Sequence, residues 1–460
     1  MARTERDVIG EVKIEDDVYY GINTYRAIEN FRISGLRADS DHIESIVQIK
    51  RSAAIANFLG KKLDAEKKDL IVKASDRIIA GDHHSDFMID VYQAGAGTSY
   101  NMNANEVIAN VALEMAGRKK GDYEFIHPND HVNMSQSTND VYPTMIRVTS
   151  VKKILKLLPE LKMLHDAFMK KAVELGGIVK PGRTHLQDAA PVTLGIEMSA
   201  YAYAMQRCYD EIDRSVEYLL DLNIGGTAVG TGINTAPDYQ KNVVAEISRI
   251  TGIAFRPSDN LPGIMEFQSD FSRAMNSVAN LALDLNKIAN DIRLLYSGPG
   301  AGIHEIRIPA VQQGSSIMPG KINPSIAEAM NMICYSVLGA QTAVNYSVQA
   351  GQLELNVMMP NIDFELNRAI DIMTTGMRMF RTKLVEGLEG EEKVCRDHLS
   401  KSFGSAALLN PYLGYDSVAK IVQEALHTGH SIKELALKTG KINEEQFDKI
   451  MGSGIPKKIR

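Results

Sequence analysis

The sequence predicts an all-α, mainly helical protein with a central bundle of long helices. The strongest pattern runs from Phe271 to Leu295, where apolar residues recur at steps of three, four and seven and therefore share one helix face. Similar patterns cover residues 154–175, 198–222 and 362–388, each longer than an average globular helix. Strand-like alternation is confined to short pieces, at residues 9–19 and at 178–180 before Pro181.

Two shifts in composition divide the chain into three predicted domains. At 460 residues the chain is longer than one hydrophobic core usually serves, so several domains are expected. The turn-rich stretches 126–139 and 387–392 mark the boundaries. We therefore predict a mostly helical N-terminal domain (1–135), a central long-helix bundle domain (136–390) and a small helical C-terminal domain (391–460). In the last, helices near 415–428 and 443–451 are expected, with a turn at Thr439 and Gly440.

The composition of the chain argues against several classes of partner. The formal net charge is −6 and the basic residues are scattered, so no surface for nucleic acid is expected. The N-terminus is charged where a signal peptide would be apolar, and no apolar run reaches membrane length. Cys208, Cys334 and Cys395 lie far apart and match no metal spacing, which is typical of a reducing compartment. We expect a cytoplasmic protein without a membrane or nucleic-acid partner.

Four segments bounded by glycine or proline concentrate hydroxyl and amide side chains. They span residues 95–106, 127–140, 182–188 and 314–324, and the last also carries Lys321. Taken singly, each is typical of a turn or a helix cap, where Ser, Thr, Asn and Asp are favoured. Together they supply neutral donors, one ammonium group and His185, which can hold or release a proton near neutrality. This set indicates a site for carboxylates, with loop 314–324 able to close over a substrate.

Two other segments carry residue types that are found in binding sites. His83, His84 and Asp86 are the nearest approach to a metal-ligand set, but a solvated loop explains them better, so no metal site is predicted. The glycine-rich stretch 225–232 lacks the Gly-Lys-Ser/Thr ending of a phosphate-binding loop, and we interpret it as a tight connection between helices.

The four polar segments together resemble the aspartase/fumarase superfamily, and the resemblance covers most of the chain, from residue 19 to residue 411. Loop 314–324, with the sequence Gly-Ser-Ser-Ile-Met-Pro-Gly-Lys-Ile-Asn-Pro, looks like the signature loop of that superfamily. Three motifs are more similar to aspartases than to fumarases: Gly-Thr-Ser at 97–99, Asn-Asp-His-Val-Asn at 129–133 and Ser-Thr-Asn-Asp at 137–140. The stretch Arg-Ala-Ile-Glu-Asn-Phe at 26–31 is also similar to aspartases.

The resemblance implies a reversible elimination of ammonia from L-aspartate to give fumarate. The β-carbon proton is weakly acidic because its removal places a second negative charge beside a carboxylate, so an enediolate must be stabilised by donors in a site without water. By resemblance, Ser315 is the proton-abstracting base, and it needs its oxyanion stabilised by backbone amides and nearby Lys321.

The resemblance also implies a role for each further site residue. One carboxylate would be held by Lys321 and Asn323, and the β-carboxylate by Thr98, Ser137, Thr138 and Ser316. Asn139 and His185 would meet the amino group, Glu328 would orient His185, and Thr184 belongs to the substrate-binding set. For His185 alone, a buried structural histidine is the other interpretation.

The implied assembly is a homotetramer in which four central domains form a core of about twenty helices. Each active site would be shared by three subunits, which explains why the polar segments lie far apart in the sequence and fits the excess apolar surface of the long helices. The implied substrate is a small dicarboxylate or amino acid. No cofactor is expected, and a divalent cation would act as an activator without taking part in the chemistry.

Three positions depart from the usual pattern of the superfamily. Ile196 stands where Gln is usual, Gly300 where Arg is usual, and Met359 where a charged residue is usual. These departures leave open a lyase acting on an N-substituted aspartate. Fumarase is the alternative within the superfamily, and a helical scaffold without activity is the alternative outside enzymes. The set of Ser315, Lys321, Asn323 and His185 argues against such a scaffold.

Overall fold

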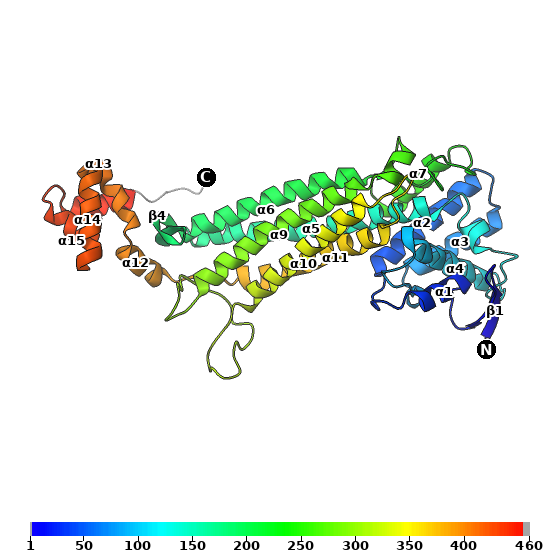
Figure 1. The fold of residues 1–460 in the computed structure, drawn as a ribbon, viewed down its shortest axis with the longest axis horizontal. Helices are drawn as coiled ribbons and strands as arrows, with labels where there is room; N and C mark the ends of the chain where they lie inside the picture. The colour runs from blue at the N-terminus through cyan, green and yellow to red at the C-terminus, as the bar shows by residue number, and fades with distance from the viewer. Residues whose placement is uncertain (1, 454–460) are drawn as a thin grey trace. The chain divides into compact units, whose positions relative to one another are not determined.

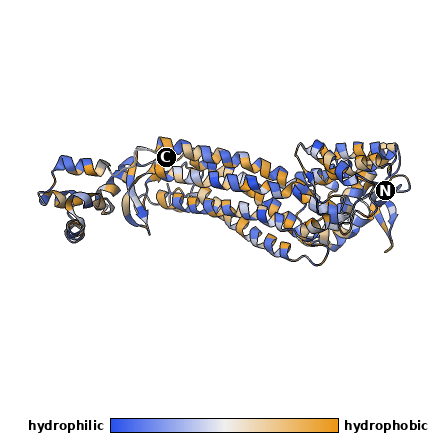
Figure 2. Ribbon diagram, turned by 90° about the horizontal axis from the view of Figure 1, so that it is seen from above, coloured by the Kyte–Doolittle hydropathy of each residue, from blue (hydrophilic) through white to orange (hydrophobic). Residues whose placement is uncertain are grey.

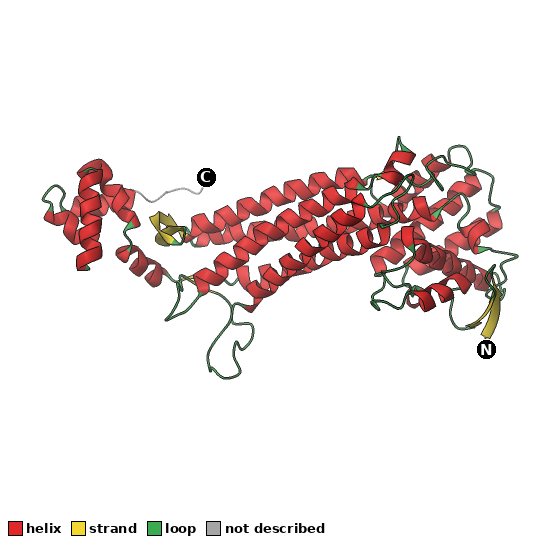
Figure 3. Cartoon of the chain, in the orientation of Figure 1, coloured by secondary structure: helices red, strands yellow, loops and turns green. Residues whose placement is uncertain are grey.

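The computed structural model describes residues 2–453, which are mainly helical (Figure 3). The described chain divides into two compact units. Unit 1 is built from residues 2–157, 211–279 and 336–372, and unit 2 from residues 158–210, 280–335 and 373–453. The long helices contribute segments to both units, so this division does not test the three predicted domains, which stay a prediction.

The N-terminal part of unit 1 is an antiparallel strand pair followed by short and medium helices. Asp39 caps helix α2 by accepting from the backbone N–H of His42, and Asp64 caps α3 by accepting from that of Lys67. The elements are β1 (Ala2–Arg6), β2 (Glu11–Glu15), α1 (Ile22–Asn30), α2 (Ser40–Leu59), α3 (Ala65–Ile79), η1 (His84–Asp86), η2 (Gly95–Gly97), α4 (Thr98–Met115) and the π-helical turn η3 (Pro128–Val132).

Five long helices form the predicted bundle (Figure 1). They are α5 (Thr138–Glu174), α6 (Leu194–Val216), α9 (Ser269–Tyr296), α10 (Ser325–Gln349) and α11 (Met359–Phe380). Shorter elements connect them: η4 (Glu217–Leu219), β5 (Asp221–Leu222), α7 (Tyr239–Thr251), β6 (Arg256–Pro257), α8 (Leu261–Glu266) and β7 (Ile306–Arg307). Hydrophobic and hydrophilic residues alternate along the long helices, as amphipathic packing requires (Figure 2).

Polar contacts join the long helices within each unit. In unit 1, the buried Arg147 of α5 donates to Asp270 of α9, and Ser272 of α9 donates to Asn345 of α10. In unit 2, the Tyr201 hydroxyl of α6 donates to Asp291 of α9 at 2.9 Å. Also in unit 2, α9 and α10 are joined through Asn286 and Asn331, and α5 and α11 through Glu160 and Arg378.

A β-hairpin precedes α6, and the sequence pattern missed most of it. Strand β3 (Val179–Thr184) continues through Pro181 and pairs antiparallel with β4 (Gln187–Thr193). A proline has no N–H for the ladder, and the register shifts between Pro181 and Gly182, so a bulge accommodates it. His185 and Leu186 form the two-residue turn with φ of 54° and 59°, as in the tight turns of such hairpins.

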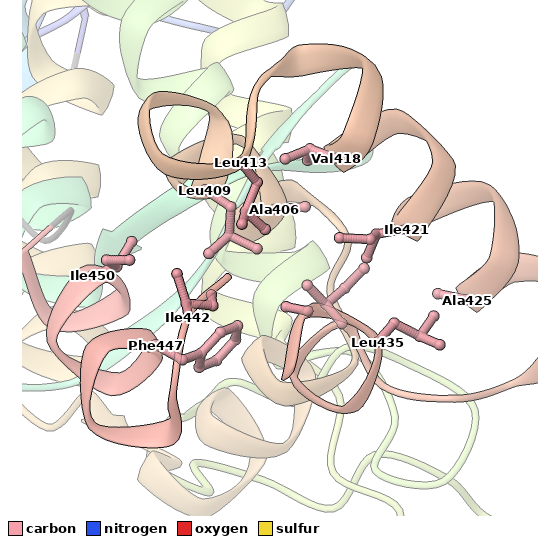
Figure 4. Packing of buried hydrophobic residues seen from close by; sticks show 12 residues of the cluster. Ala406, Leu409, Leu413, Val418, Ile421, Ala425, Leu435, Ile442, Phe447 and Ile450 are labelled. Carbon is pink, nitrogen blue, oxygen red and sulfur yellow. The ribbon is translucent and has the colours of Figure 1, made fainter. Parts of the chain in front are cut away.

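The C-terminal helices enclose a hydrophobic core of their own (Figure 4). Leu409, Leu413, Ile421, Leu435 and Phe447 are among its buried members. The elements are the π-helical turn η5 (Arg381–Val385), β8 (Glu389–Gly390), α12 (Glu392–Lys401), η6 (Gly404–Leu409), α13 (Asn410–Leu413), α14 (Tyr415–Thr428), α15 (Ile432–Lys438) and α16 (Glu444–Ser453). Helix α14 has the predicted bounds, whereas α15 was not predicted. Across residues 2–453, the helices lack the combination of length and apolar character that spanning a bilayer requires.

Candidate active site

A first pocket, in unit 1, lies at the beginning of helix α5. It has a volume of about 620 Å³, and Asn101, Ser137, Thr138 and Thr227 are among its lining residues. Ser137 precedes α5, and its hydroxyl oxygen accepts from the backbone N–H of Asn139 at 3.2 Å. The helix therefore begins where the sequence places hydroxyl side chains, and these serve both as cap and as pocket wall.

Asp140 is buried beside this pocket and holds the backbone of the segments that form its wall. Its carboxylate accepts from the backbone N–H groups of Ser137, Gly225 and Thr227 at 2.9 to 3.0 Å. Burial raises the Asp140 pKa to about 7, although these hydrogen bonds oppose the shift. The glycine-rich stretch 225–232 is a tight connection, as predicted, but it also supplies a wall of the pocket, which was not predicted.

The hairpin turn of unit 2 carries His185, which lines a second pocket of about 440 Å³ with Lys180, Arg183 and Tyr201. His185 and Thr184 are both exposed. His185 is therefore not a buried structural histidine, which was the other interpretation of this residue.

A buried carboxylate anchors the hairpin next to that turn. Glu305 has no exposed side-chain surface and forms a bidentate ion pair with Arg183. The distances are 2.7 Å from Nη2 to Oε1 and 2.9 Å from Nη1 to Oε2. Lys180 at 2.8 Å and His398 at 2.9 Å contact the same carboxylate. Burial alone would raise the Glu305 pKa, but Arg183 and Lys180 outweigh it and lower the pKa.

The loop of residues 314–324 places a serine oxygen against backbone amides. Ser315 Oγ accepts from the N–H groups of Ile317 at 3.3 Å and Met318 at 3.1 Å. The two ends of the loop are tied together, since Gly314 N–H donates to the Lys321 carbonyl and Asn323 Nδ2 donates to the Gly314 carbonyl. A Cβ on Gly314 would lie 2.5 Å from the Lys321 oxygen, so glycine is required there.

A third pocket, in unit 2, lies beside this loop. It has a volume of about 500 Å³ and is lined by Lys321, Asn323 and Glu328 together with Arg293 and His304. Two carboxylate-binding candidates and the candidate orienting carboxylate are thus brought to one pocket. Glu328 lines this pocket and His185 lines the second, so the described chain does not place the two residues in one pocket.

The remaining predicted residues belong to the same sequence segments as the residues that line these pockets. Thr98 begins α4 and is exposed, with its hydroxyl donating to the Gly95 carbonyl at 3.2 Å. Asn139 donates from Nδ2 to the Ala228 carbonyl at 2.8 Å. Ser316 is exposed in the loop after Ser315, which is half-buried. Six of the eleven predicted residues therefore line the three pockets, two in unit 1 and four in unit 2. The other five, which are Thr98, Asn139, Thr184, Ser315 and Ser316, line none of these three pockets.

Sequence reasoning missed three residues at these pockets. Lys50 of α2 is fully buried behind the first pocket, and Arg293 and His304 line the third. For Lys50 a signal existed: the lysine lies three or four positions from Ile46, Val47, Ala53 and Ala54, and so shares the apolar face of the helix. For Arg293 and His304 no sequence pattern pointed to a shared pocket.

The three positions that depart from the superfamily pattern differ in their surroundings. Ile196 is half-buried in the first turn of α6 and Met359 is fully buried at the beginning of α11. Gly300 is exposed, and nothing lies within 4 Å of a Cβ placed on it. Space at position 300 therefore does not exclude a larger residue.

Comparisons with known proteins place this fold and these segments in one family. A family model described as lyase matches residues 10–339, and one described as fumarase C C-terminus matches residues 406–452. The chain belongs to this lyase family, the aspartase/fumarase superfamily.

Among its relatives, the aspartate ammonia-lyase of Bacillus subtilis is 45% identical over 98% of this chain and 94% of the relative. The class II fumarate hydratase of Ralstonia nicotianae is 41% identical over 97% of each chain. A crystal structure of fumarate lyase:delta crystallin from Brucella melitensis, bound to cobalt, superposes with a TM-score of 0.95. It is 40% identical and the match covers 99% of each chain.

Proposed function

We propose that this protein is an aspartate ammonia-lyase, which converts L-aspartate reversibly to fumarate and ammonia. The proposal is carried by its likeness to aspartate ammonia-lyases, 45% and 43% identical over almost the whole chain. The environment of Ser315 supports it, because two backbone N–H groups already face the oxygen that would become an oxyanion.

In the proposed reaction, the Ser315 oxyanion removes the proton from the β-carbon of aspartate. A serine hydroxyl is ordinarily far too weak an acid to be ionised at neutral pH, so its anion must be stabilised by the site. The N–H groups of Ile317 and Met318 supply two donors to that oxygen. Closure of the loop over a bound substrate would remove water and strengthen both hydrogen bonds.

The electrons released by proton removal pass to the β-carboxylate, which becomes an enediolate with two negative charges. We assign Thr98, Ser137, Thr138 and Ser316 as donors to this group. Lys321 and Asn323 would hold the other carboxylate. Donors that bind the developing charge more strongly than the starting carboxylate lower the barrier to proton removal.

In the second step the bond from the α-carbon to nitrogen breaks, and the electron pair of the enediolate forms the double bond of fumarate. The amine leaves as ammonia. Asn139 and His185 are assigned to the amino group, with Thr184 beside them and Glu328 orienting His185. Thr184 at the end of β3 and His185 in the turn are both exposed, so both side chains are available to a substrate.

The proposal includes a homotetramer with a core of about twenty helices and active sites that three subunits share. The assigned residues that line pockets are divided among three of them, which supports shared sites. Exposed apolar side chains on the long helices also support it, including Val173, Tyr203, Met332 and Tyr346, which are 64% to 77% exposed in the single chain. A cytoplasmic location and the absence of a cofactor are parts of the same proposal, with a divalent cation acting only as an activator.

The test follows the ultraviolet absorbance of fumarate, once in plain buffer and once with ammonium. Loss of fumarate only with ammonium is the expected result. Loss in plain buffer would make the protein a fumarase, which the 41% identity to a fumarate hydratase makes the second candidate. Loss only when a substituted amine replaces ammonium would identify a lyase for N-substituted aspartates, and no loss in any mixture would leave an inactive scaffold.

Dialysis against a chelator completes this test. We expect the chelated enzyme to keep its turnover at saturating aspartate, because no assigned step uses a metal. Complete loss that only a divalent cation restores would contradict the proposed chemistry.

A further inference from the structure

Lys50 lies behind the first pocket, fully buried on helix α2. Its ammonium group donates to Asn101 Oδ1 at 2.6 Å and to Asn133 Oδ1 at 2.7 Å. A buried lysine normally pairs with a carboxylate, whereas both of these partners are neutral amides. The residues assigned to the substrate do not include Lys50, so its burial requires another explanation.

The lysine determines the orientation of the Asn101 amide. An ammonium group can only donate, so the amide oxygen must face Lys50 and the amide nitrogen must face away. Asn101 Nδ2 accordingly donates to Thr138 Oγ1 at 3.1 Å and, over a longer 3.4 Å, to Asn133 Oδ1, which Lys50 also holds. An asparagine amide can otherwise rotate by half a turn and exchange its donor for its acceptor.

This orientation controls what the Thr138 hydroxyl can do. Its oxygen already accepts a hydrogen bond from Asn101, so its own hydrogen is left to donate elsewhere. Thr138 lines the pocket at the beginning of α5, where a carboxylate is proposed to bind. Lys50, Asn101 and Thr138 thus form a chain of hydrogen bonds in which each donor lies on the lysine side and each acceptor on the pocket side. In such a chain, each hydrogen bond strengthens the next.

The electrostatic surroundings of the lysine fit this arrangement. Burial lowers the Lys50 pKa to about 7, while Asp140 opposes the shift. Its neighbour on α2, Arg51, is engaged by Asp76 of α3 and Glu246 of α7. A carboxylate entering the pocket would favour the charged lysine, so the amine can respond to the substrate without touching it.

We propose that Lys50 is a positioning residue that, through Asn101, directs the Thr138 hydroxyl to donate to the substrate's carboxylate. The inference rests on the proposed function, because it takes Thr138 as a donor to the β-carboxylate. Without the lysine, the Asn101 amide can rotate so that its oxygen accepts the Thr138 hydrogen, and the substrate loses that donor.

The test is a double-mutant cycle with Lys50→Met, Thr138→Ala and the double variant, using kcat/KM for aspartate. We expect each single change to lower kcat/KM by about tenfold to a hundredfold, the usual cost of one donor to a developing charge. The double variant should lose no more than Thr138→Ala alone. The loss should fall mainly on kcat, because the donor acts on charge that develops in the reaction. Normal activity of Lys50→Met, or multiplied losses in the double variant, would overturn the inference.

A second variant covers the case in which Lys50→Met does not fold. Asn101→Asp keeps an acceptor for the lysine but removes the N–H that faces Thr138, so the same loss in kcat is expected with the lysine in place. Lys153→Met is the matched control, since Lys153 is also a buried lysine of unit 1 but pairs with Asp39 and Asp371. Its folded fraction should keep normal kcat, and normal kcat in Asn101→Asp would contradict the inference.

Binding of succinate separates this inference from the proposed function. Succinate is a dicarboxylate that cannot react, and calorimetry measures its affinity for each variant. If the wild-type protein neither binds succinate nor deaminates aspartate, the proposed function fails and the inference fails with it. If the wild type is active and Lys50→Met equals it in both measurements, only the role of Lys50 is overturned.

Discussion

At the scale of single residues, the clearest chemical feature is the Ser315 hydroxyl and the two amides that face it. The sequence could indicate that a serine base needs such donors, but not that the residues two and three positions later would provide them. This geometry depends on the backbone of the loop, which no residue pattern encodes directly.

Ser315→Ala should abolish turnover while leaving assembly and succinate binding close to those of the wild type. The side chain removed is the proposed base, and it makes no contact that holds the loop ends together. The measurements are the ammonium-dependent absorbance assay and calorimetry with succinate. Gln312→Ala is the control, since Gln312 is exposed two residues before the loop begins. Near-normal turnover in Ser315→Ala would remove Ser315 from the role of base.

His42 gives a prediction for the pH dependence of stability. Its ring contacts Asp39 at 2.7 Å and Asp363 at 3.0 Å. Burial would lower the His42 pKa, but the two carboxylates outweigh it and raise the pKa to about 10. Because the charged ring is favoured in the folded protein, its contribution is complete below the usual pKa of 6.5 and is lost as the pH rises toward 10.

The thermal unfolding midpoint should therefore fall between pH 6.5 and 10 in the wild type, and fall less in His42→Gln. Scanning calorimetry at constant ionic strength measures both slopes. His430→Gln is the matched control, because His430 is 51% exposed and contributes little. Equal slopes for wild type and His42→Gln would show that this histidine does not carry the pH dependence.

At the scale of elements, apolar periodicity predicted the long helices correctly only over those stretches that have one apolar face. The predicted pattern at 271–295 falls within α9 (Ser269–Tyr296). The pattern at 154–175 began late, because the first turns of α5 bury polar side chains such as Thr144, Arg147 and Ser150. Arg147 and Ser150 form hydrogen bonds with Tyr218, Asp270 and Asn367, which lie far away in the sequence, and no periodicity reveals such bonds in advance.

Helix α4 was hidden for the same reason. Its segment was interpreted as a polar cluster, yet Asn101, Asn103, Asn105 and Asn110 are buried within a helix. The sequence therefore indicated a group of polar residues in this segment, but it did not indicate that they lie on a helix. Residue types indicate which groups can donate or accept hydrogen bonds. Whether those groups are buried depends on neighbours that are distant in the sequence.

The hairpin β3–β4 yields a prediction about its anchor. Glu305→Gln should lower the unfolding free energy by about 3 kcal/mol or more, because Lys180 and Arg183 lose their buried carboxylate. It should also lower kcat/KM through displacement of the turn that carries His185. Chemical denaturation and the absorbance assay measure the two effects.

Glu389→Gln is the control for this prediction. Glu389 pairs with Arg307 at an exposed position, with 63% of its side chain accessible, so its loss should cost less than about 1 kcal/mol. Similar effects of the two changes would mean that Glu305 is not the anchor of the hairpin.

At the scale of the whole molecule, the proposed tetramer can be tested by mixing two variants of low activity. Thr138→Ala and Ser315→Ala should each have greatly reduced activity, but unfolding and refolding them together should restore turnover. If a site takes Thr138 from one subunit and Ser315 from another, roughly a quarter of the sites in random mixtures contain both intact residues. Light scattering should give a mass about four times that of the 50.7 kDa chain. No recovery by mixed tetramers would contradict shared sites.

The beginning of α5 at the first pocket has a consequence that concerns the backbone. The peptide dipoles of this 37-residue helix leave a partial positive charge at its N-terminus, where Thr138 and the preceding Ser137 line the pocket. Part of the attraction for an anion therefore belongs to the main chain, as in helix-terminal anion sites generally. Replacing every hydroxyl there would remove hydrogen bonds to a bound carboxylate but would leave this attraction in place. Variants that no longer catalyse the reaction should therefore keep some affinity for dicarboxylates.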